Sequence, residues 1–420
     1  MRRGGFFNMF IIISVITLIM DWYVFNGLKT FTADWQSRVA RNVVTWGYLV
    51  LSVGVTILFV LGFVVGDMSK GMPTYQTWLF SIFLMMLVTK LVFIIVLSLG
   101  DLTRFIYGIA ENVSGKRKEG EPYFPSRRKF VSELAILIAA FPFASFLYAM
   151  VRGKYDYKVH RSTIFFEDLP EAFDGFTITQ LSDIHSGSFD NTEAMQKGID
   201  LAKAQQSDLF VFTGDLVNNG AWEIEPYIDR FGSIKAPFGQ FSILGNHDYG
   251  DYLQWPSPQA KVDNLNKLKK HHAELGYRLL LDENVSLVKD GQKISLIGVQ
   301  NWGRGFIQLG DLNKALKGVD KDAFKVLLSH DPTHWEEQVR YHDTDIHLTL
   351  SGHTHGAQFG VETAGLRWSP VQYRYLDWAG LIAQGKRHLY VNRGFGFLGF
   401  SGRLGIWPEI TVITLKKGKA

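Results

Sequence analysis

The feature that most constrains the fold of this 420-residue chain is a series of short apolar runs that each end in Asp, Asn or His. The first run, Phe176–Gln180, is followed by Leu181-Ser182-Asp183-Ile184-His185. A β-branched run that stops at a polar loop is typical of a buried parallel strand, which delivers the next side chains to the carboxyl edge of a sheet. Asp183 and His185, two apart in such a loop, can both reach one ion.

Four more runs have this form. The residues that follow them are Gly214-Asp215-Leu216-Val217-Asn218, Gly245-Asn246-His247-Asp248, Ser329-His330 and Gly352-His353-Thr354-His355. In chain order the five groups read D-x-H, G-D-x-x-[DN], G-N-H-[DE], a lone His and G-H-x-H. This series resembles the calcineurin-like metallophosphoesterases, and the resemblance covers residues 160–420. It implies an α/β fold, the four-layer α/β/β/α sandwich of that family.

The spacing of apolar residues gives the coarse order of elements in this region. Helical spacing over Glu193–Gln206, Trp222–Ile234 and Gln259–Leu275 predicts three helices. Strands and helices alternate between residues 176 and 250, which indicates βαβ units and a mainly parallel sheet. Val285–Val299 breaks the alternation and predicts a β-hairpin around Asp290-Gly291.

The resemblance also implies a centre of two divalent metal ions, which would be Mn, Fe, Zn or Mg. Asp215 would bridge the two ions, and a hydroxide between them would attack phosphorus in line. The remaining ligands would be Asp183, His185 and His355 at the first ion, and Asn246, His330 and His353 at the second. Because the chain has no Cys, its metal ligands must be His, Asp and Asn, which suit these metals.

Three further residues receive roles near the centre. By resemblance, His247 would stand beside the leaving group as general acid or transition-state stabiliser, and Asp248 would orient or charge it. Asn218 stands where many relatives have Asp, and is expected to support the loop without binding metal. Arg393 follows a late strand and would either meet a phosphoryl oxygen of the substrate or form a surface ion pair.

Two segments have a structural interpretation that outweighs a functional one. His271 and His272 fall on a basic helix that we expect to be exposed, with a solvated face favoured over contact with anionic lipid headgroups. Gly394–Trp407 crowds aromatic residues into a glycine-rich loop. We expect this loop to pack against the sheet edge, although it could instead form an apolar lip beside the metals.

The N-terminal third predicts a membrane anchor. It contains four apolar stretches long enough to cross a bilayer, which takes about 20 residues. They are Phe6–Phe25, Val44–Gly66, Trp78–Leu99 and Val131–Val151. The predicted domains are therefore a four-helix transmembrane anchor over residues 1–151 and the phosphoesterase domain over 152–420. Asp21 and Lys90 are charged residues within the stretches; each could face another helix, or Asp21 could lie near the membrane interface.

The distribution of Lys and Arg predicts the orientation of this multi-pass membrane protein. Ten of these residues lie in the loops after the first and third stretches, and five lie before the first, after the second and just after the fourth. The positive-inside rule then places the catalytic domain outside the cytoplasm. Ser126–Val131 resembles a twin-arginine export signal, which would make the export machinery a partner, but it reads equally as a basic anchor.

Together these features predict a membrane-anchored, dinuclear-metal phosphoesterase acting on a phosphate ester, a pyrophosphate or a lipid phosphate. An alternative is an enzyme like the UDP-2,3-diacylglucosamine pyrophosphatases of lipid A synthesis, whose active site would have to face the cytoplasm. A second alternative is a metal-binding membrane sensor or scaffold without activity. The net charge of +4 is small and dispersed, so we expect no nucleic-acid partner.

Overall fold

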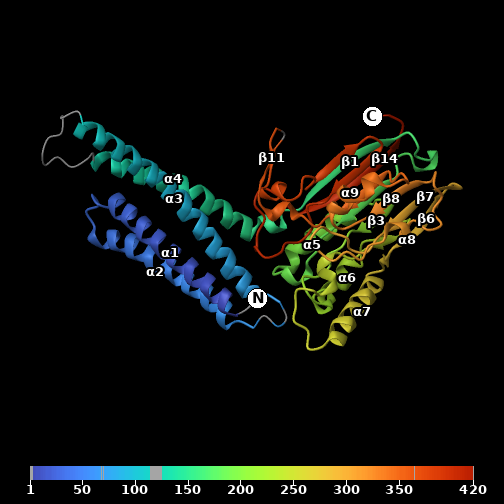
Figure 1. Cartoon of the computed structure of the whole chain (residues 1–420), viewed down its shortest axis with the longest axis horizontal. Helices are drawn as coiled ribbons and strands as arrows, with labels where there is room; N and C mark the ends of the chain where they lie inside the picture. The colour runs from blue at the N-terminus through green and yellow to red at the C-terminus, as the bar shows by residue number, and fades with distance from the viewer. Residues whose placement is uncertain (1–2, 68, 70, 114–124, 364, 420) are drawn as a thin grey trace. The chain divides into compact units, whose positions relative to one another are not determined.

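The computed structural model describes residues 3–67, 69, 71–113, 125–363 and 365–419 (Figure 1). Several basic residues used in the orientation argument, among them Lys70 and Lys116, lie outside this part of the chain. The chain divides into two compact units. One comprises residues 1–67 and 75–148, and the other comprises residues 68–74 and 149–420.

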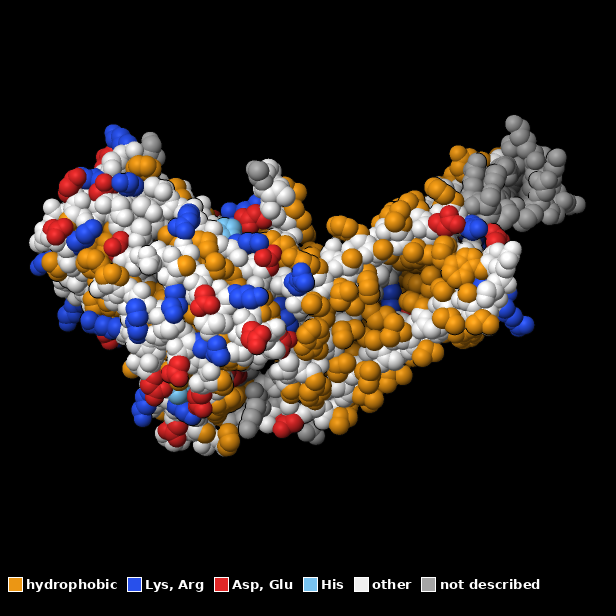
Figure 2. All heavy atoms as spheres, turned by 180° about the vertical axis from the view of Figure 1, so that it is seen from behind, with side chains coloured by type: hydrophobic (Ala, Val, Ile, Leu, Met, Phe, Trp, Pro, Cys, Tyr) orange, Lys and Arg blue, Asp and Glu red, His pale blue; other side chains and the backbone are white. Residues whose placement is uncertain are grey.

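The first unit is built from four long helices. They are α1 (Arg3–Phe31), α2 (Arg38–Val65), α3 (Thr74–Val113) and α4 (Pro125–Val151). Each contains a stretch long and apolar enough to span a membrane, which confirms the four predicted spans. Hydrophobic side chains cover much of the surface of this unit, in the way that lipid-facing helices require (Figure 2). Ser126–Val131 forms the first turns of α4.

The two charges within the predicted spans bind each other. Lys90 Nζ lies 2.7 Å from Asp21 Oδ1, and both side chains are buried. The same oxygen accepts hydrogen bonds from Tyr48 at 2.8 Å and Ser52 at 2.7 Å. This cluster joins α1, α2 and α3, as expected for charges that would be costly against lipid.

The second unit contains two six-stranded sheets. The first has the order β1-β14-β2-β3-β4-β5 and the second has the order β12-β13-β9-β8-β7-β6. The strands of the first sheet are β1 (Lys158–Phe166), β2 (Thr177–Leu181), β3 (Leu209–Phe212), β4 (Gln240–Ser242), β5 (Arg278–Leu279) and β14 (Glu409–Lys417). Those of the second are β6 (Glu283–Lys289), β7 (Gln292–Gly298), β8 (Phe324–Leu328), β9 (Leu348–Ser351), β12 (Gly380–Gln384) and β13 (Arg387–Val391). Most neighbouring strands run parallel, as predicted.

Alternating side chains on the strands create the layers. On β3, Leu209 and Val211 enter the core between the sheets, whereas Phe210 and Phe212 face outward. Helices α5 (Thr192–Lys203), α6 (Ile228–Phe231) and α7 (Pro258–Glu274) cover the outer face of the first sheet. Helices α8 (Leu312–Ala315) and α9 (Pro332–Glu337) cover the second sheet. The expected α/β/β/α sandwich is therefore confirmed.

Two local predictions have different outcomes. The hairpin is confirmed, since β6 pairs antiparallel with β7 around Asp290 and Gly291, whose φ angles of 50° and 78° suit a two-residue turn. The continuous helix over Trp222–Ile234 is wrong. Short 3₁₀ turns at 221–223 and 225–227 precede the four-residue α6. Pro226 explains the break, because it has no backbone N–H and starts a turn rather than continuing one.

The expected exposure of His271 and His272 is also wrong. Their exposed fractions are 5% and 0%. His272 Nδ1 lies 2.9 Å from Ser242 Oγ on β4, and its ring lies beside Phe212. The lysines of α7 had suggested a solvated face, but His272 faces the sheet, and His271 is buried between the carboxylates of Glu225 and Glu274.

Candidate metal centre

The strand ends of both sheets bring the predicted ligands together. Strands β2, β3 and β4 of the first sheet and β8 and β9 of the second each end just before one of the five motifs. Six of the seven predicted ligands are buried and the seventh, His353, is half-buried. Residues up to 172 positions apart in sequence, from Asp183 to His355, therefore share one polar interior.

Two clusters of possible ligand atoms form there. Asp183, His185 and His355 make one, and Asp215, His330 and His353 make the other, with ligand atoms within 4.8 Å of one another in each. Asn246 belongs beside the second, because its Oδ1 lies 2.8 Å from His353 Nδ1. This is the grouping that the sequence predicted.

Asp215 lies between the two clusters. Its Oδ2 is 3.1 Å from His330 Nε2 and 3.6 Å from His185 Nε2. Its Oδ1 accepts the backbone N–H of His247 at 2.8 Å, which fixes the plane of the carboxylate. One oxygen thus faces a histidine of each cluster, the arrangement that a bridging carboxylate needs.

Hydrogen bonds set which ring nitrogen of each histidine faces the centre. His330 Nδ1 donates to the carbonyl oxygen of Thr213 at 2.7 Å, so its Nε2 faces Asp215. His353 has its Nε2 2.8 Å from the Tyr375 hydroxyl and 3.3 Å from Asp331 Oδ2, so its Nδ1 faces Asn246. Such outer partners hold metal-binding histidines in position. The sequence analysis missed both Tyr375 and Asp331, although Asp331 directly follows the predicted ligand His330.

Several atoms at the centre have no hydrogen-bond partner. Both ring nitrogens of His185 and the Nε2 of His355 are buried and have no hydrogen-bond partner. A buried polar atom without a partner costs about 1–3 kcal/mol. Lone pairs of this kind, gathered around carboxylates, fit a divalent cation, and the donor set of imidazole nitrogen and carboxylate oxygen suits the metals named above.

The backbone is also strained at these positions. Five predicted ligands are non-glycine residues in the left-handed region, with φ values of 52° for Asp183, 47° for His185, 60° for Asp215, 71° for His353 and 51° for His355. Such conformations are costly and gather at functional sites. Gly214, before Asp215, has φ of 95°, and a Cβ there would lie 2.6 Å from the backbone nitrogen of Gly245. The glycines of the motifs thus allow the loops to approach one another.

Burial and charge tune the protonation of the centre. Burial lowers the pKa of His185 to about 3 and that of His353 to about 4, so both rings are neutral near pH 7 and keep a lone pair for metal. His330 behaves differently. Burial opposes its charged form, but the Asp215 carboxylate outweighs this and raises the pKa of His330 to about 10. A metal ion at Asp215 would therefore take the place of a proton.

His247 lies next to the clusters with its ring held by the backbone. Its Nδ1 is 2.8 Å from the carbonyl oxygen of Asn218, and its ring centroid is 4.9 Å from that of His185. The Asn218 side chain bonds Ser188 at 2.9 Å, which is the supporting role expected for this position.

Asp248 does not have the role expected of it. Its buried carboxylate accepts backbone N–H groups of Gly245 at 2.8 Å and of Asp215 and Leu216 at 2.9 Å. The ring partner of His247 is Asn218 instead. Asp248 therefore fixes two motif loops to each other, because one carboxylate can accept several backbone donors.

The interpretation of Arg393 as a substrate-binding or surface residue is wrong. Its exposed fraction is 3%, and its guanidinium lies 2.6 Å from both Glu409 Oε2 and Glu362 Oε1. Burial opposes its charge, but the two carboxylates outweigh it and hold the pKa of Arg393 above its usual value. Glu409 and Glu362 lie 16 and 31 residues from Arg393 in the sequence, so no local pattern predicted these ion pairs.

The glycine-rich segment after Arg393 packs into the protein. Phe395, Phe397 and Ile406 are buried, which confirms the packing interpretation for these side chains. Gln358 holds the segment through hydrogen bonds to the carbonyl oxygens of Phe400 at 2.9 Å and Gly402 at 3.1 Å. Arg403 was not predicted, yet its Nη2 lies 3.0 Å from His355 Nδ1.

Aromatic and cationic side chains surround the second cluster. The rings of Phe306 and His353 are 4.7 Å apart, and the rings of Tyr252 and His247 are 4.3 Å apart. The exposed Arg374 lies over Phe306 at 5.4 Å and over Tyr375 at 5.5 Å. We call Tyr252, Phe306 and Arg374 the rim. No sequence motif marked these residues.

A sandwich with paired histidine and carboxylate clusters at its strand ends defines the class of metal-dependent phosphoesterases. Comparison with known families agrees for both units. Residues 176–357 match the calcineurin-like phosphoesterase family, and residues 3–154 match a probable calcineurin-like phosphoesterase transmembrane domain. The chain belongs to the calcineurin-like phosphoesterases and is a membrane-anchored, metal-dependent phosphoesterase.

Individual relatives are similar over more than half of the chain. The metallophosphoesterase YkuE of Bacillus subtilis is 31% identical over 252 residues, which are 59% of this chain and 82% of that protein. The phosphodiesterase YaeI of Escherichia coli is 27% identical over 295 residues, which are 69% of this chain and 99% of that protein. A transmembrane protein with metallophosphoesterase domain from Danio rerio is 28% identical over 68% of this chain, which spans 62% of that longer protein.

Proposed function

We propose that this enzyme hydrolyses phosphodiesters with two divalent metal ions held by Asp183, His185, Asp215, Asn246, His330, His353 and His355. The observation that carries the proposal is the position of Asp215, whose Oδ2 faces one histidine of each cluster at 3.1 and 3.6 Å. When bound, such a pair of ions activates water and neutralises phosphoryl oxygens. The intact ligand set and the family favour an enzyme over a sensor or scaffold.

His247 would protonate the leaving oxygen. Its Nδ1 donates to the Asn218 carbonyl, so its Nε2 is the nitrogen available to substrate. The ring stands between His185 and the rim residue Tyr252, at the edge of the centre. A general acid positioned in this way increases the reaction rate about 10²–10⁴-fold.

The rim supports a phosphodiester over a simple phosphate. Arg374, rather than Arg393, supplies an exposed guanidinium close to the second cluster, and it forms no ion pair among the described residues. A guanidinium binds phosphoryl oxygens in a bidentate manner, and the ring of Phe306 offers a surface for the organic part of the substrate. The relative YaeI is named a phosphodiesterase, which agrees with this choice.

The twin-arginine interpretation of Ser126–Val131 has less support than the basic anchor. The matched transmembrane domain runs over residues 3–154 and so includes this segment as part of the anchor.

Turnover by the purified full-length protein with Mn²⁺ tests the proposal. We expect bis-p-nitrophenyl phosphate to be cleaved faster than p-nitrophenyl phosphate. His247→Ala should lose about 10²–10⁴ in kcat while it keeps two metal ions per chain. His342→Gln is the control and should keep full activity, because His342 pairs with Asn313 and belongs to neither cluster.

Two results would change the assignment. Cleavage of UDP-2,3-diacylglucosamine, without cleavage of the diester, would establish the lipid A alternative. A protein that binds two metal ions yet cleaves none of these substrates would overturn the phosphodiester proposal.

A further inference from the structure

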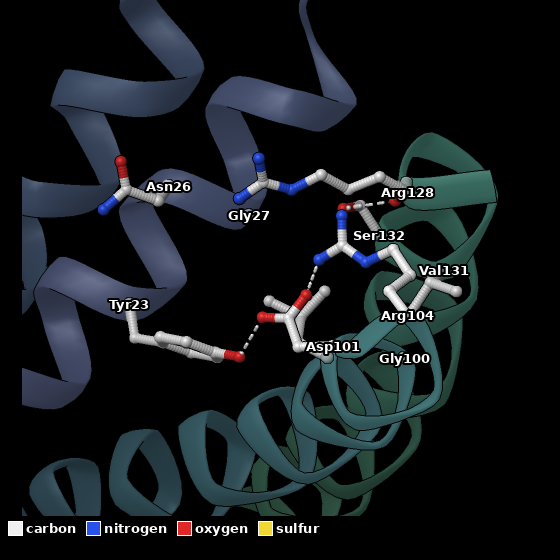
Figure 3. A pocket seen from close by; sticks show the side chains of 10 residues that line it. Tyr23, Asn26, Gly27, Gly100, Asp101, Arg104, Arg128, Val131 and Ser132 are labelled. Carbon is white, nitrogen blue, oxygen red and sulfur yellow. Dashed lines mark hydrogen bonds and ion pairs between the residues drawn. The ribbon is translucent and has the colours of Figure 1, made fainter. Parts of the chain in front are cut away.

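The membrane unit contains a polar hollow between α1, α3 and α4 (Figure 3). Its cavity volume is about 30 Å³, and the space reaches about 350 Å³ only when the open solvent at its mouth is counted. Tyr23 from α1, Asp101 and Arg104 from α3, and Arg128 from α4 contribute its polar side chains. The hollow lies wholly within this unit, so it is separate from the candidate metal centre in the other unit.

The charges of the hollow do not balance. Arg104 forms an ion pair with Asp101, whose other oxygen accepts the Tyr23 hydroxyl at 2.6 Å. The Arg128 guanidinium forms no ion pair among the described residues, although it points into the same space (Figure 3). Two guanidiniums and one carboxylate leave one net positive charge. An anion with several oxygens can bind both guanidiniums, which repel each other otherwise.

The helices that form the walls of the hollow are closely packed. A Cβ on Gly27 of α1 would lie 2.6 Å from Leu97 Cδ1, and a Cβ on Gly100 of α3 would lie 2.6 Å from Val131 Cγ1. The helices therefore approach closely on both sides of the charged group, as small residues allow in membranes. These contacts hold the three helices together, and the ion pair with Asp101 holds the Arg104 guanidinium at the hollow.

The hollow lies near the ends of the apolar stretches predicted from the sequence, where lipid headgroups are expected. It combines the end of the first apolar stretch, the end of the third and the beginning of the fourth. Arg104 follows Leu99 by five residues, a rise of about 7.5 Å beyond the apolar stretch. Around it, Leu102, Phe105 and Phe130 are 53–67% exposed. An arginine pair beside exposed apolar side chains suits a ligand with a phosphate and acyl chains, rather than a free phosphate.

The position of the hollow at one end of the four helices indicates which leaflet of the membrane supplies the ligand. The hollow is at the end that carries the two most basic loops, which the positive-inside rule assigns to the cytoplasm. The cytoplasmic leaflet contains the anionic lipids, and basic pockets between helices there bind their headgroups. We propose that the hollow binds the phosphate of an anionic phospholipid through Arg104 and Arg128.

The test measures lipid binding to the full-length protein in neutral detergent. Phosphatidylglycerol, phosphatidylcholine and inorganic phosphate are added separately, and binding is followed by thermal stability and by native mass spectrometry. We expect phosphatidylglycerol to stabilise the protein, with little effect from the other two. Arg128→Gln should weaken the phosphatidylglycerol affinity about fivefold. Arg38→Gln, an exposed arginine at the same end but outside the hollow, should not.

A second pair of variants changes the charge in the opposite direction. Asp101→Asn removes the acid that competes for Arg104 and should tighten binding, whereas Glu133→Gln, on the exposed side of α4, should not. Equal stabilisation by both lipids, or equal weakening by Arg128→Gln and Arg38→Gln, would overturn the proposal. Stabilisation by inorganic phosphate as strong as that by phosphatidylglycerol would overturn the choice of a lipid as ligand.

Discussion

Among single residues, Asp215 should matter most, because its carboxylate faces both clusters. Asp215→Asn keeps the shape of the side chain but removes the charge that two cations would share. We expect the variant to lose both metal ions and at least a thousandfold in activity, measured by elemental analysis and by diester hydrolysis. Asp200→Asn, on the exposed face of α5, is the matched control. Full metal content in Asp215→Asn would contradict the bridging role.

Asp248 and His247 are adjacent in sequence, but we expect their replacement by Ala to have different effects. Asp248 accepts three backbone N–H groups at 2.8–2.9 Å from two motif loops. Asp248→Ala would leave these donors unpaired in the interior, at about 1–3 kcal/mol each. We therefore expect lower thermal stability and loss of metal, whereas His247→Ala should lose turnover alone. A stable, metal-loaded but inactive Asp248→Ala would restore the catalytic interpretation.

Variants of Arg393 and Arg374 should likewise differ: the first should affect stability and the second substrate binding. Arg393→Gln leaves Glu409 buried without its partner, which costs about 3–5 kcal/mol and should lower the melting temperature. Arg374→Gln removes an exposed guanidinium from the rim, so we expect a raised KM for the diester at unchanged melting temperature. Steady-state kinetics and thermal melts of both variants check this pair. If Arg374→Gln left KM unchanged, the rim would have no part in substrate binding.

At the scale of elements, the contact between α7 and β4 should make the catalytic unit sensitive to acid. Burial lowers the pKa of His272 to about 3, far below the ordinary value of about 6.5. Between pH 6.5 and pH 3, His272 is therefore protonated in the unfolded chain but neutral in the folded protein. The stability that depends on neutral His272 is complete above pH 6.5 and is lost as the pH falls toward 3, by about 2 kcal/mol at pH 5.

Replacing His272 should remove part of this acid sensitivity. We expect the melting temperature of His272→Gln to fall less than that of the unaltered protein between pH 7 and pH 5, by about 4 °C. His342→Gln serves as the control, because it removes a histidine outside this contact. An equal fall in all three proteins would show that His272 does not control the acid response.

The elements that the sequence predicted well are those with a strong local pattern. The strands before Asp183, Asp215 and His330 are short, apolar and closed by a polar loop, so both the sheet edge and the ligands could be predicted. The helix expected at Trp222–Ile234 failed where a local signal, Pro226, was given too little weight.

Other features depend on contacts between distant segments. The Arg393–Glu362 pair, Tyr375 beside His353 and the buried face of α7 each involve residues with no local signature. Polar residues of this kind are exposed on most proteins, and only the tertiary fold shows that these are buried and paired. The rim residues could not be predicted for the same reason.

For the whole molecule, the number of spans and the basic loops together determine which compartment holds the catalytic unit. Four spans place the loop between α1 and α2 on the opposite side of the membrane from the catalytic unit, whatever the orientation. The absence of Cys from the sequence makes single-cysteine labelling of both sides straightforward. Gln292 at the start of β7 and Gln36 between α1 and α2 are exposed positions for this purpose.

Intact cells carrying Gln292→Cys or Gln36→Cys are treated with a membrane-impermeant maleimide. Because the basic loops favour the cytoplasm, we expect Gln292→Cys to react in intact cells and Gln36→Cys only after lysis. The reverse result would place the catalytic unit in the cytoplasm and make the UDP-2,3-diacylglucosamine alternative the leading one. It would also move the arginine hollow to the outer leaflet, away from the anionic lipids proposed to fill it. With four spans, α2, α3 and α4 lie between residues 36 and 292, so the two residues are on opposite sides of the membrane. Reaction of both cysteines in intact cells would therefore contradict four spans.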